Sequence, residues 1–414
     1  MAESTVRLAD LCDFIGVQVD PASRGDGVYV GLEHVASGRF TRIGEGKASD
    51  VQSAKYVFQA GDVLYGKLRP YLDKAVLAPA SGICTTELLV LRPKEGVDPR
   101  FLVGVVHAPC FLEHAVAGTT GVQHPRTSWN HIRDFELPAF KPDEQTTIAS
   151  ILWEVHDAIM ANEGTIEAGA NLKRAAMRAL FTKGLRGEAQ KETEIGPVPE
   201  SWDVVSIGSV ATNTQYGLSV RGQTSGAYPI LRMNCQEDGK VHYRNLQFVD
   251  LDNVTFGSFR LQPGDLLFNR TNSIELVGRM AMVEDARDAV FASYLVRVSL
   301  DDARCLPAYL NYFMNWPKTQ DDIKRLASRA VGQANINASK LRTVLFPLPT
   351  LDEQREIAAA LDAIDRKIDL HRRKRAVLDD LFRALLHKLM TGEIRVADLD
   401  LPALAARSKA EVAA

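Results

Sequence analysis

The sequence lacks the long apolar runs and paired cysteines that would place it in a membrane or around a disulfide framework. No apolar run in the 414 residues reaches the roughly 18–20 residues that a membrane-spanning helix needs. The N-terminus has no basic segment followed by an apolar stretch, so no secretory signal is evident. Five cysteines, at positions 12, 84, 110, 235 and 305, are an odd number without a CxxC pair. We therefore expect reduced, mostly buried thiols and a cytoplasmic protein.

The chain also has little net charge. Its formal charge is −3, from 49 basic and 52 acidic side chains, which disfavours a protein that coats nucleic acid non-specifically. Such a charge is compatible with sequence-specific DNA binding, because a local basic face can be balanced by acidic residues elsewhere. It predicts that this chain alone would bind DNA weakly and that a partner would supply much of the phosphate contact.

Catalytic and metal-binding motifs are missing as well. There is no GxGxxG and no Asn-Pro-Pro-aromatic motif. Residues 42–48 approach a phosphate-binding loop, but the first glycine is replaced by Thr41 and the hydroxyl residue by Ala48. Histidines 107, 114, 124 and 131 lack the spacing of metal ligands. We expect no catalytic residue, no metal site and no cofactor in this chain.

What the sequence does contain is an internal repeat. The triplet Asp143-Glu144-Gln145 returns as Asp352-Glu353-Gln354, an offset of 209 residues. The same offset pairs Ile148 with Ile357, Leu152 with Leu361, Ile159 with Ile368 and Leu172 with Leu381. An apolar strand punctuated by proline precedes each triplet. This period is far longer than that of a solenoid, so each copy is a domain followed by a long helix.

The repeat predicts an α+β (mixed α/β) fold in which two long antiparallel helices separate two pseudo-symmetric globular domains. The expected first globular domain covers residues 1–140, and the central helix covers 141–190. The second globular domain covers 191–349, and the C-terminal helix covers 350–395. Residues 396–414 are expected to form a flexible tail.

The two helices carry a heptad pattern, with apolar residues at alternating steps of four and three. The expected pairing seam consists of Ile357, Leu361, Ile364, Ile368 and His371 in the second helix and of Ile148, Leu152, Val155, Ile159 and Asn162 in the first. Leu172 is expected to continue the seam of the first helix. Asn162 and His371 stand at equivalent seam positions and would fix the register. About 40 residues predict a rod of ~60 Å. An ordinary hairpin inside one core is disfavoured, because about 200 residues separate the helices.

The helix ends have their own signals. Thr350 and Glu353 predict a capping box, and Gly392 stands where a glycine commonly ends a helix. Capping and favourable charge at the positive helix end explain the repeated acidic residues better than catalysis does. Gly164 and Gly169 weaken the first helix by about 1 kcal/mol each relative to alanine.

Each globular domain contains a Gly-Asp turn, an apolar strand and then a polar loop. A second polar loop near the end of each domain reads GTTGVQHPRTSW (118–129) or VGQANINASK (331–340). Such side chains on loops contact phosphates and base edges in DNA. The candidate DNA-binding residues are Lys67, Arg69, Tyr71, Gln123, Arg126 and Thr127 in the first domain and Asn269, Arg270, Thr271, Asn272, Gln333, Asn335, Asn337 and Lys340 in the second. An ordinary solvated loop is the alternative for each residue alone; the recurrence favours DNA binding for the set.

Several strings in this order resemble the specificity subunit of type I restriction–modification enzymes. They are GDVLYGKLRPYLDK (61–74), the PDEQ and LDEQREIA helix starts, and IGPVPESW (195–202), and the resemblance covers nearly the whole chain. Lys67, Arg69 and Arg126 match the family's patterns, whereas the second domain matches them more loosely. The resemblance implies two domains that each read one half of a split double-stranded DNA target, with helices that set the gap between the halves.

The resemblance also implies partners. Two methyltransferase subunits would dock on the helices and restriction–translocase subunits would complete the enzyme, so S-adenosylmethionine, ATP and Mg²⁺ are expected in those partners. Two alternatives stay open. One is the recognition subunit of another modification system, and the other is a coiled-coil scaffold without a role in DNA binding. The sequence does not reveal which bases are read.

Overall fold

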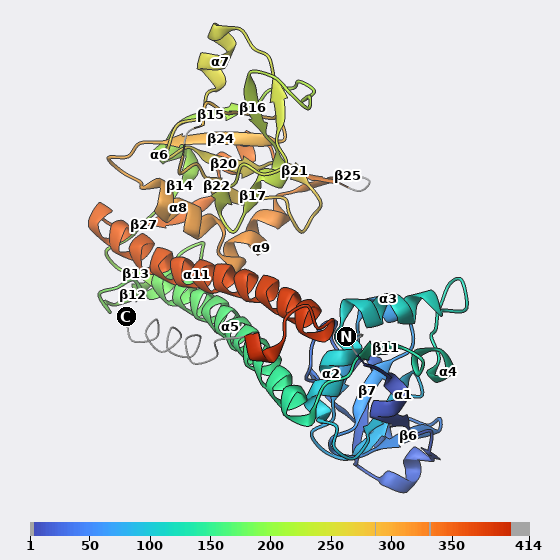
Figure 1. The fold of residues 1–414 in the computed structure, drawn as a ribbon. Helices are drawn as coiled ribbons and strands as arrows, with labels where there is room; N and C mark the ends of the chain where they lie inside the picture. Colours follow the sequence, from blue (N-terminus) through green and yellow to red (C-terminus); the bar gives the residue numbers. More distant parts are fainter. Residues whose placement is uncertain (1–3, 286, 331–332, 399–414) are drawn as a thin grey trace. The chain divides into compact units, whose positions relative to one another are not determined.

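The computed structural model describes residues 4–285, 287–330 and 333–398 and divides into two compact units. Of the described residues, unit 1 comprises 4–164 and 371–398, and unit 2 comprises those between 165 and 370. The long helices α5 (Pro142–Lys183) and α11 (Leu351–Met390) each contribute one segment to each unit (Figure 1). The units therefore differ from the expected division into globular and helical domains. Most of the expected tail, residues 399–414, lies outside the described residues.

Unit 1 contains head 1, which we define as residues 4–140. Its four-stranded sheet has the order β2-β10-β7-β8 (Cys12–Phe14, Leu88–Pro93, Val63–Gly66 and Ala75–Leu77). A five-stranded sheet has the order β3-β6-β9-β4-β5 (Gln18–Val19, Lys55–Phe58, Gly82–Cys84, Val28–Val30 and Gly46–Lys47). The helices are α1 (Leu8–Leu11), α2 (Pro99–His107), α3 (Pro109–Ala117) and α4 (Trp129–Ile132). Strand β1 (Thr5–Arg7) pairs with β11 (Glu136–Pro138), which leads into α5.

Unit 2 contains head 2, which we define as residues 195–349. Its main sheet has the order β15-β24-β20-β22-β18-β17 (Ala211–Tyr216, Leu295–Leu300, Leu266–Asn269, Met280–Met282, Lys240–Val241 and Gln236–Glu237). Two three-stranded sheets have the orders β19-β16-β23 (Gln247–Val249, Tyr228–Leu231 and Val290–Phe291) and β21-β26-β25 (Thr271–Asn272, Gln333–Asn335 and Ser328–Ala330).

The remaining elements of unit 2 connect or cover these sheets. Strand β12 (Gln190–Lys191) pairs with β13 (Val198–Pro199), and β14 (Asp203–Ser206) pairs with β27 (Leu345–Leu348), which leads into α11. The helices are α6 (Ile207–Val210), α7 (Asn253–Phe259), α8 (Pro307–Met314), α9 (Pro317–Arg325) and α10 (Ala338–Arg342).

The two heads share one topology, which confirms the two pseudo-symmetric domains. The order β2-β10-β7-β8 of head 1 returns as β15-β24-β20-β22 in head 2, and β1–β11 returns as β14–β27. In each head one parallel strand pair occurs in the second sheet, β4 with β9 and β16 with β23. Head 2 adds β17 and β18 at one edge of its main sheet.

The repeated Gly-Asp turn is a structural element of each head. The Asp62 carboxylate accepts a hydrogen bond from the Gln59 amide at 2.7 Å and two from the Arg92 guanidinium at 2.8 Å each. In head 2, the Asp265 carboxylate accepts from the Gln262 amide at 2.8 Å and lies 3.5 Å from Arg297. Asp62 is only 2% exposed, and pairing of this kind is what makes a buried carboxylate tolerable. The motif recurs because it begins the central strand of each head.

In unit 1 the segments of α5 and α11 run antiparallel and complete the core of head 1. Seam residues Ile148, Leu152 and Ile159 are 1–2% exposed and share a core cluster with Phe382, Leu386 and Leu389 of α11 and with Phe101 and Leu102 of α2. Val155 packs at the edge of this cluster. Nδ1 of His371 lies 2.8 Å from Oδ1 of Asn162, so the two polar seam residues bond to each other. This contact fixes one alignment of the two helices.

In unit 2 the segments of α5 and α11 are also antiparallel and pack under head 2. Ile357 and Leu361 are fully buried in a cluster with Met177 and Phe181 of α5, and Ile364 is half-buried. Lys173 pairs with Asp365 at 2.7 Å, and Ile368 packs close to Gly169. One expectation is wrong: Leu172 is 57% exposed and does not continue the seam, and its repeat partner Leu381 is 44% exposed.

The starts of the long helices depend on the repeated glutamine as well as on capping. Gln145 accepts from the Asp98 amide at 3.3 Å, and Gln354 accepts from the Leu306 amide at 2.8 Å. Each glutamine therefore links its long helix to the start of a shorter helix of its head, α2 in head 1 and α8 in head 2. The expected capping box is half formed. The Glu353 amide donates to Thr350 Oγ1 at 3.4 Å, but the Glu353 carboxylate accepts instead from the indole of Trp202 at 3.0 Å. Gly392 ends α11 at a φ of 74°, as expected.

Candidate nucleic-acid interface

The structure brings the two polar loops of head 1 side by side. We name them loop A1 (residues 67–72), which follows β7, and loop B1 (residues 119–127). The Lys67 carbonyl accepts from the Thr127 amide at 3.0 Å, and the Arg69 amide donates to the Pro125 carbonyl at 2.7 Å. An isolated antiparallel bridge joins Leu68 to Arg126. These backbone bonds hold the two loops as one surface.

Head 2 repeats this arrangement. Loop A2 (residues 270–276) follows β20, and loop B2 consists of the described residues of the β25–β26 hairpin and the turn after it, 328–330 and 333–337. Strand β21 of loop A2 pairs with β26 of loop B2, with Thr271 opposite Asn335. The Arg270 carbonyl accepts from the Ile336 amide at 2.9 Å. The two loops that the sequence predicted as a set therefore meet in both heads, although 46 residues separate loops A1 and B1 along the chain and 51 residues separate loops A2 and B2.

The backbone bonds define which residues are equivalent in the two heads. Thr127 donates to Lys67 just as Ile336 donates to Arg270, so Lys67 and Arg270 occupy the same place. Both are basic. The side chain of Lys67 has no hydrogen bond or ion pair with any residue in the described ranges, and it is only half-buried. An accessible cation at the same point of each head suits a phosphate or a base edge.

The remaining candidates of head 1 differ in exposure. Tyr71 is 52% exposed at the tip of loop A1, and Gln123 is exposed on loop B1. Thr127 is 3% exposed, so its side chain is not on the surface. Arg69 has left-handed backbone at a φ of 51°, and its guanidinium lies 3.5 Å from the Gln123 carbonyl. Loop A1 thus presents an arginine and a tyrosine at an unusual turn.

Several candidate residues of head 2 are buried or form hydrogen bonds within the head. Asn269 is 2% exposed at the end of β20, so its side chain does not reach the surface. The Asn337 side chain caps α10 by accepting from the Lys340 amide at 2.8 Å, and the Lys340 ammonium bonds to the Leu326 carbonyl at 2.8 Å. Half-buried Arg270, Thr271, Asn272 and Asn335 and exposed Gln333 are left to form the surface.

Two interactions order the basic side chains, and both involve residues that the sequence analysis missed. Glu87, on the turn before β10, accepts from Nε of Arg126 at 3.0 Å, and this hydrogen bond raises the pKa of Arg126 above its ordinary value. The guanidinium of Arg270 lies 4.8 Å from the ring centroid of Tyr216 and donates to the Ser293 carbonyl at 3.2 Å. These partners lie far from Arg126 and Arg270 in the sequence, so no local pattern could have indicated them.

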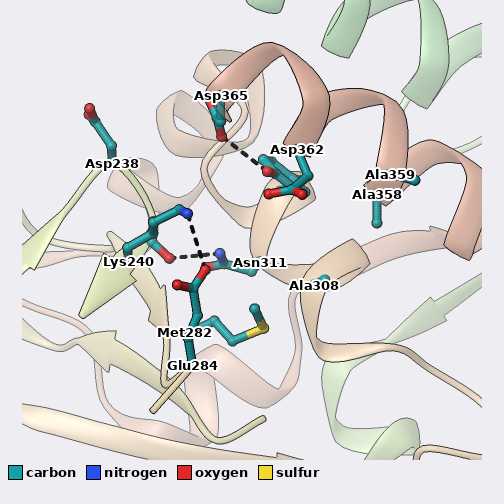
Figure 2. A pocket seen from close by; sticks show the side chains of 12 residues that line it. Asp238, Lys240, Met282, Glu284, Ala308, Asn311, Ala358, Ala359, Asp362 and Asp365 are labelled. Atoms are coloured by element: carbon teal, nitrogen blue, oxygen red, sulfur yellow. Dashed lines mark hydrogen bonds and ion pairs between the residues drawn. The ribbon is translucent and has the colours of Figure 1, made fainter. Parts of the chain in front are cut away.

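A pocket of about 320 Å³ in unit 2 offers a contrasting environment. Figure 2 shows Asp238, Glu284, Asp362 and Asp365 around it, and Lys240 is the one cation among its lining residues. The Lys240 ammonium pairs with Glu284 at 3.2 Å. Phosphate groups would meet net repulsion here, so this surface between β18, α8 and α11 is unsuited to DNA. The polar loops remain the favoured interface.

Other kinds of site find no support in the part of the chain that the structure describes. No group of three or more histidine, cysteine, aspartate or glutamate side chains there is placed to hold a metal ion. No described helix is long and apolar enough to cross a membrane. All five cysteines are free thiols, and four of them are buried.

Comparison with known proteins points in one direction. A family model described as type I restriction modification DNA specificity domain matches residues 199–379. The MjaX specificity subunit of Methanocaldococcus jannaschii is 31% identical over 204 residues, which are 49% of this chain and 48% of the relative. The MjaVIII specificity subunit of the same organism is 23% identical over 95% of this chain and 93% of the relative. The EcoKI specificity subunit of Escherichia coli is 25% identical over 74% and 68%.

Solved structures share the fold. The S subunit of a type I restriction–modification system from M. genitalium superposes with a TM-score of 0.61 at 12% identity, over 94% of this chain and 96% of that chain. A chain from a structure on the assembly of a type I system superposes with a TM-score of 0.55 at 20% identity, over 95% and 99%. At these identities the likeness concerns the fold alone.

Proposed function

This chain belongs to the family of type I restriction–modification DNA specificity subunits, and from this premise we propose that each head reads one half of a bipartite double-stranded DNA target. The observation that carries the proposal is the repeated meeting of two polar loops. Loop A1 bonds to loop B1, and loop A2 bonds to loop B2, through the same backbone contacts. One loop pair per head suits one half-site per head, with side chains that enter the major groove.

The second part of the proposal concerns the helices. Each long helix runs from one unit into the other, so its length would set the gap between the half-sites. The polar seam pair Asn162 and His371 supports a fixed register, because a slip of either helix would leave both side chains without their hydrogen bond. Leu172 and Leu381, exposed at equivalent positions, would each contribute to docking of one methyltransferase subunit.

The third part concerns the reaction. This chain would position the complex and would not itself catalyse a step. The methyltransferase partners would hold S-adenosylmethionine, flip the target adenine out of the helix and methylate it. Restriction–translocase partners would use ATP and Mg²⁺. We place the complex in the cytoplasm, where its DNA substrate would lie.

The test is reconstitution with the methyltransferase subunit of the same system. We expect a complex of one specificity chain and two methyltransferase chains, which binds and methylates a split DNA sequence. Neither protein alone should methylate that sequence. Methylome sequencing of cells that produce both chains would show adenine methylation at one bipartite motif. The proposal would be overturned if the specificity chain methylated DNA by itself. It would also be overturned if the complex retained no DNA, and that result would favour the scaffold alternative.

A further inference from the structure

Arg126 and Asn335 occupy the same place in the two heads. Arg126 forms a bridge with Leu68 of loop A1, and Asn335 pairs with Thr271 of loop A2. The residue after each donates its amide to the same carbonyl of the facing loop, which is that of Lys67 or Arg270. Arg126 and Asn335 are also related by the 209-residue offset of the repeat. The fold thus presents a guanidinium in one head and a carboxamide at the equivalent point of the other.

The guanidinium of Arg126 is held on two sides. Its Nε donates to Glu87 Oε2 at 3.0 Å, and its Nη2 donates to Glu87 Oε1 at 3.2 Å. Its Nη1 donates to the His124 carbonyl at 3.2 Å. A guanidinium has five N–H groups, so one N–H on each Nη atom is left without an acceptor among the described residues. The side chain is 43% exposed. Two parallel N–H groups at the end of an arginine match the O6 and N7 acceptors of guanine in the major groove.

The carboxamide of Asn335 is held by one bond. Its Nδ2 donates to Thr271 Oγ1 at 2.7 Å, which leaves one N–H and the whole Oδ1 acceptor without a partner in the described residues. A free carboxamide edge of one donor and one acceptor matches N7 and the N6 amino group of adenine. The partially exposed side chain is fixed at its Nδ2, so its free edge has a defined direction.

An ion pair on the surface does not by itself explain why Glu87 faces Arg126. Exposed pairs of this kind contribute little to stability, because water and salt screen them. A carboxylate near a DNA-binding surface also repels phosphate. The Glu87 carboxylate has a clear role if it orients the Arg126 guanidinium toward a base. A guanidinium with a fixed orientation discriminates between bases better than a mobile one.

We propose that these two positions are specificity determinants: head 1 requires a guanine through Arg126, oriented by Glu87 as a positioning residue, and head 2 requires an adenine through Asn335. This inference rests on the proposed DNA-reading function and goes further, because it assigns a base type to each head. It also places two different hydrogen-bonding groups at equivalent points of one repeated fold. In this way a duplicated domain could read two different half-sites.

The experiment uses the full chain in complex with its methyltransferase partner and a library of duplex DNA with randomised half-sites. The wild-type complex should require a guanine in one half-site and an adenine in the other. Arg126→Gln should lower discrimination at the guanine position by about 5- to 150-fold, the value of one bidentate contact. The other half-site should stay the same. Asn335→Ala should relax one adenine position in the opposite half-site only.

Glu87→Gln tests the positioning role. It should relax preference at the same guanine position as Arg126→Gln, but less, while Glu87→Asp should restore part of the preference. Asn253→Ser is the matched control, because Asn253 is an exposed asparagine of head 2 that lies on α7, outside loops A2 and B2, and its change should leave the base preferences unchanged.

The outcomes are distinguishable. If Arg126→Gln weakens binding to all sequences equally and lowers the salt dependence, Arg126 contacts phosphate, and the inference fails while DNA reading by the heads stands. The inference also fails if the wild-type half-sites lack these bases. A wild-type complex that retains no DNA would instead refute the proposed function itself.

Discussion

Arg69 combines a strained backbone with a nearly unengaged side chain. Its φ of 51° is in the left-handed region, which a non-glycine residue adopts at a cost of about 1 kcal/mol or more. The Pro125 carbonyl holds its amide at 2.7 Å, while its guanidinium has only contacts of 3.5 Å. A turn that is held in this way and carries an accessible cation is typical of a binding site.

We therefore expect Arg69→Ala to weaken binding of the complex to its cognate DNA by about 1–3 kcal/mol if the side chain reads a base. If it contacts phosphate, the loss should be the same for all sequences, and the slope of affinity against salt should fall by about one. Fluorescence anisotropy at several salt concentrations would measure both. Arg7→Ala is the control, because Arg7 is an exposed arginine that lies on β1, beside the strand that leads into α5, and not on a polar loop. Unchanged affinity for Arg69→Ala would remove loop A1 from the DNA surface.

His156 provides a residue-scale test of the packing in unit 1. It is fully buried, stacks on the Phe40 ring at 5.1 Å, and its Nε2 accepts from the Phe40 amide at 3.2 Å. Burial lowers the pKa of His156, and Arg39 and His107 lower it further, whereas Asp157 opposes the shift. The neutral ring is thus the form that the folded protein favours.

Because the pKa of His156 is lower in the folded state, its stabilising contribution is complete above the unfolded value of about 6.5 and is lost as the pH falls below it. We expect His156→Gln to cost less stability at about pH 5.5 than at about pH 7.5. Urea unfolding midpoints at both pH values would measure this difference. His107 is present in both the wild type and the variant, so its own effect on stability largely cancels when the two are compared. His124→Gln changes an exposed histidine and serves as control. An equal cost at both pH values would contradict the assignment.

At the scale of elements, the two glycines of α5 have different roles. A Cβ added to Gly164 would meet nothing within 4 Å, whereas one added to Gly169 would lie 2.8 Å from Cγ1 of Ile368. Gly169 therefore permits the close approach of α5 and α11 in unit 2, and Gly164 carries only the conformational cost of glycine in a helix.

We expect Gly164→Ala to raise the free energy of unfolding by about 0.5–1 kcal/mol. Gly169→Ala should lower it by about 1–3 kcal/mol, because the added methyl overpacks the helix pair. Chemical denaturation of both variants would measure these changes. In the Gly169→Ala background, Ile368→Ala should cost less than it does alone. Equal stabilisation by both alanines would show that the helices do not pack as described.

The elements also show how far the sequence could lead. The repeat, the seam at Ile148 and Ile357 and the glycine that ends α11 were predictable, because each depends on periodicity or on local backbone geometry. The bond between Gln354 and Leu306 and the burial of Asn269 were not, because they depend on segments far apart in the chain. Leu172 fits the heptad pattern yet is exposed, since a period does not say which apolar residues a neighbouring helix covers.

The same limit applies to the candidate interface. The sequence predicted the loops as pairs, but it could not separate Arg126, which is ordered by Glu87, from Asn337, which caps a helix. Residue type alone suits both roles. Only the tertiary contacts show which polar side chains are used within the head and which present free hydrogen-bonding groups.

At the scale of the whole molecule, the duplication predicts two equivalent docking places. Leu172 belongs to unit 2 and Leu381 to unit 1, and both are exposed leucines at the same repeat position. We expect Leu172→Asp or Leu381→Asp to release one methyltransferase subunit and the double variant to release both, because a buried, unpaired carboxylate would be costly at the interface. Native mass spectrometry would count the subunits. Val254→Asp, at an exposed position on α7, is the control, and full assembly of the double variant would refute docking there.

The length of the long helices gives the last prediction, because continuous helices transmit any change in length from one unit to the other. α5 has 42 residues and α11 has 40, which correspond to about 60 Å each. Inserting about one turn after Ile166 in α5 and another after Lys367, near the facing point of α11, adds ~6 Å while roughly preserving the seam. At ~3.4 Å per base pair, the gap in the recognised sequence should grow by one or two base pairs.

Both half-sites should remain unchanged in this insertion variant, because Arg126, Asn335 and the loops around them are untouched. Methylome mapping of the variant beside the wild type would report the gap and the half-sites together. A variant with the insertion in α5 only is the control, since unequal helices cannot keep both the Asn162–His371 and the Lys173–Asp365 contacts. It should lose activity or stability instead of acquiring a new gap. If the matched insertion left the gap as it was, or altered the bases of either half-site, the helices would not set the spacing, and the heads would have to find their half-sites independently.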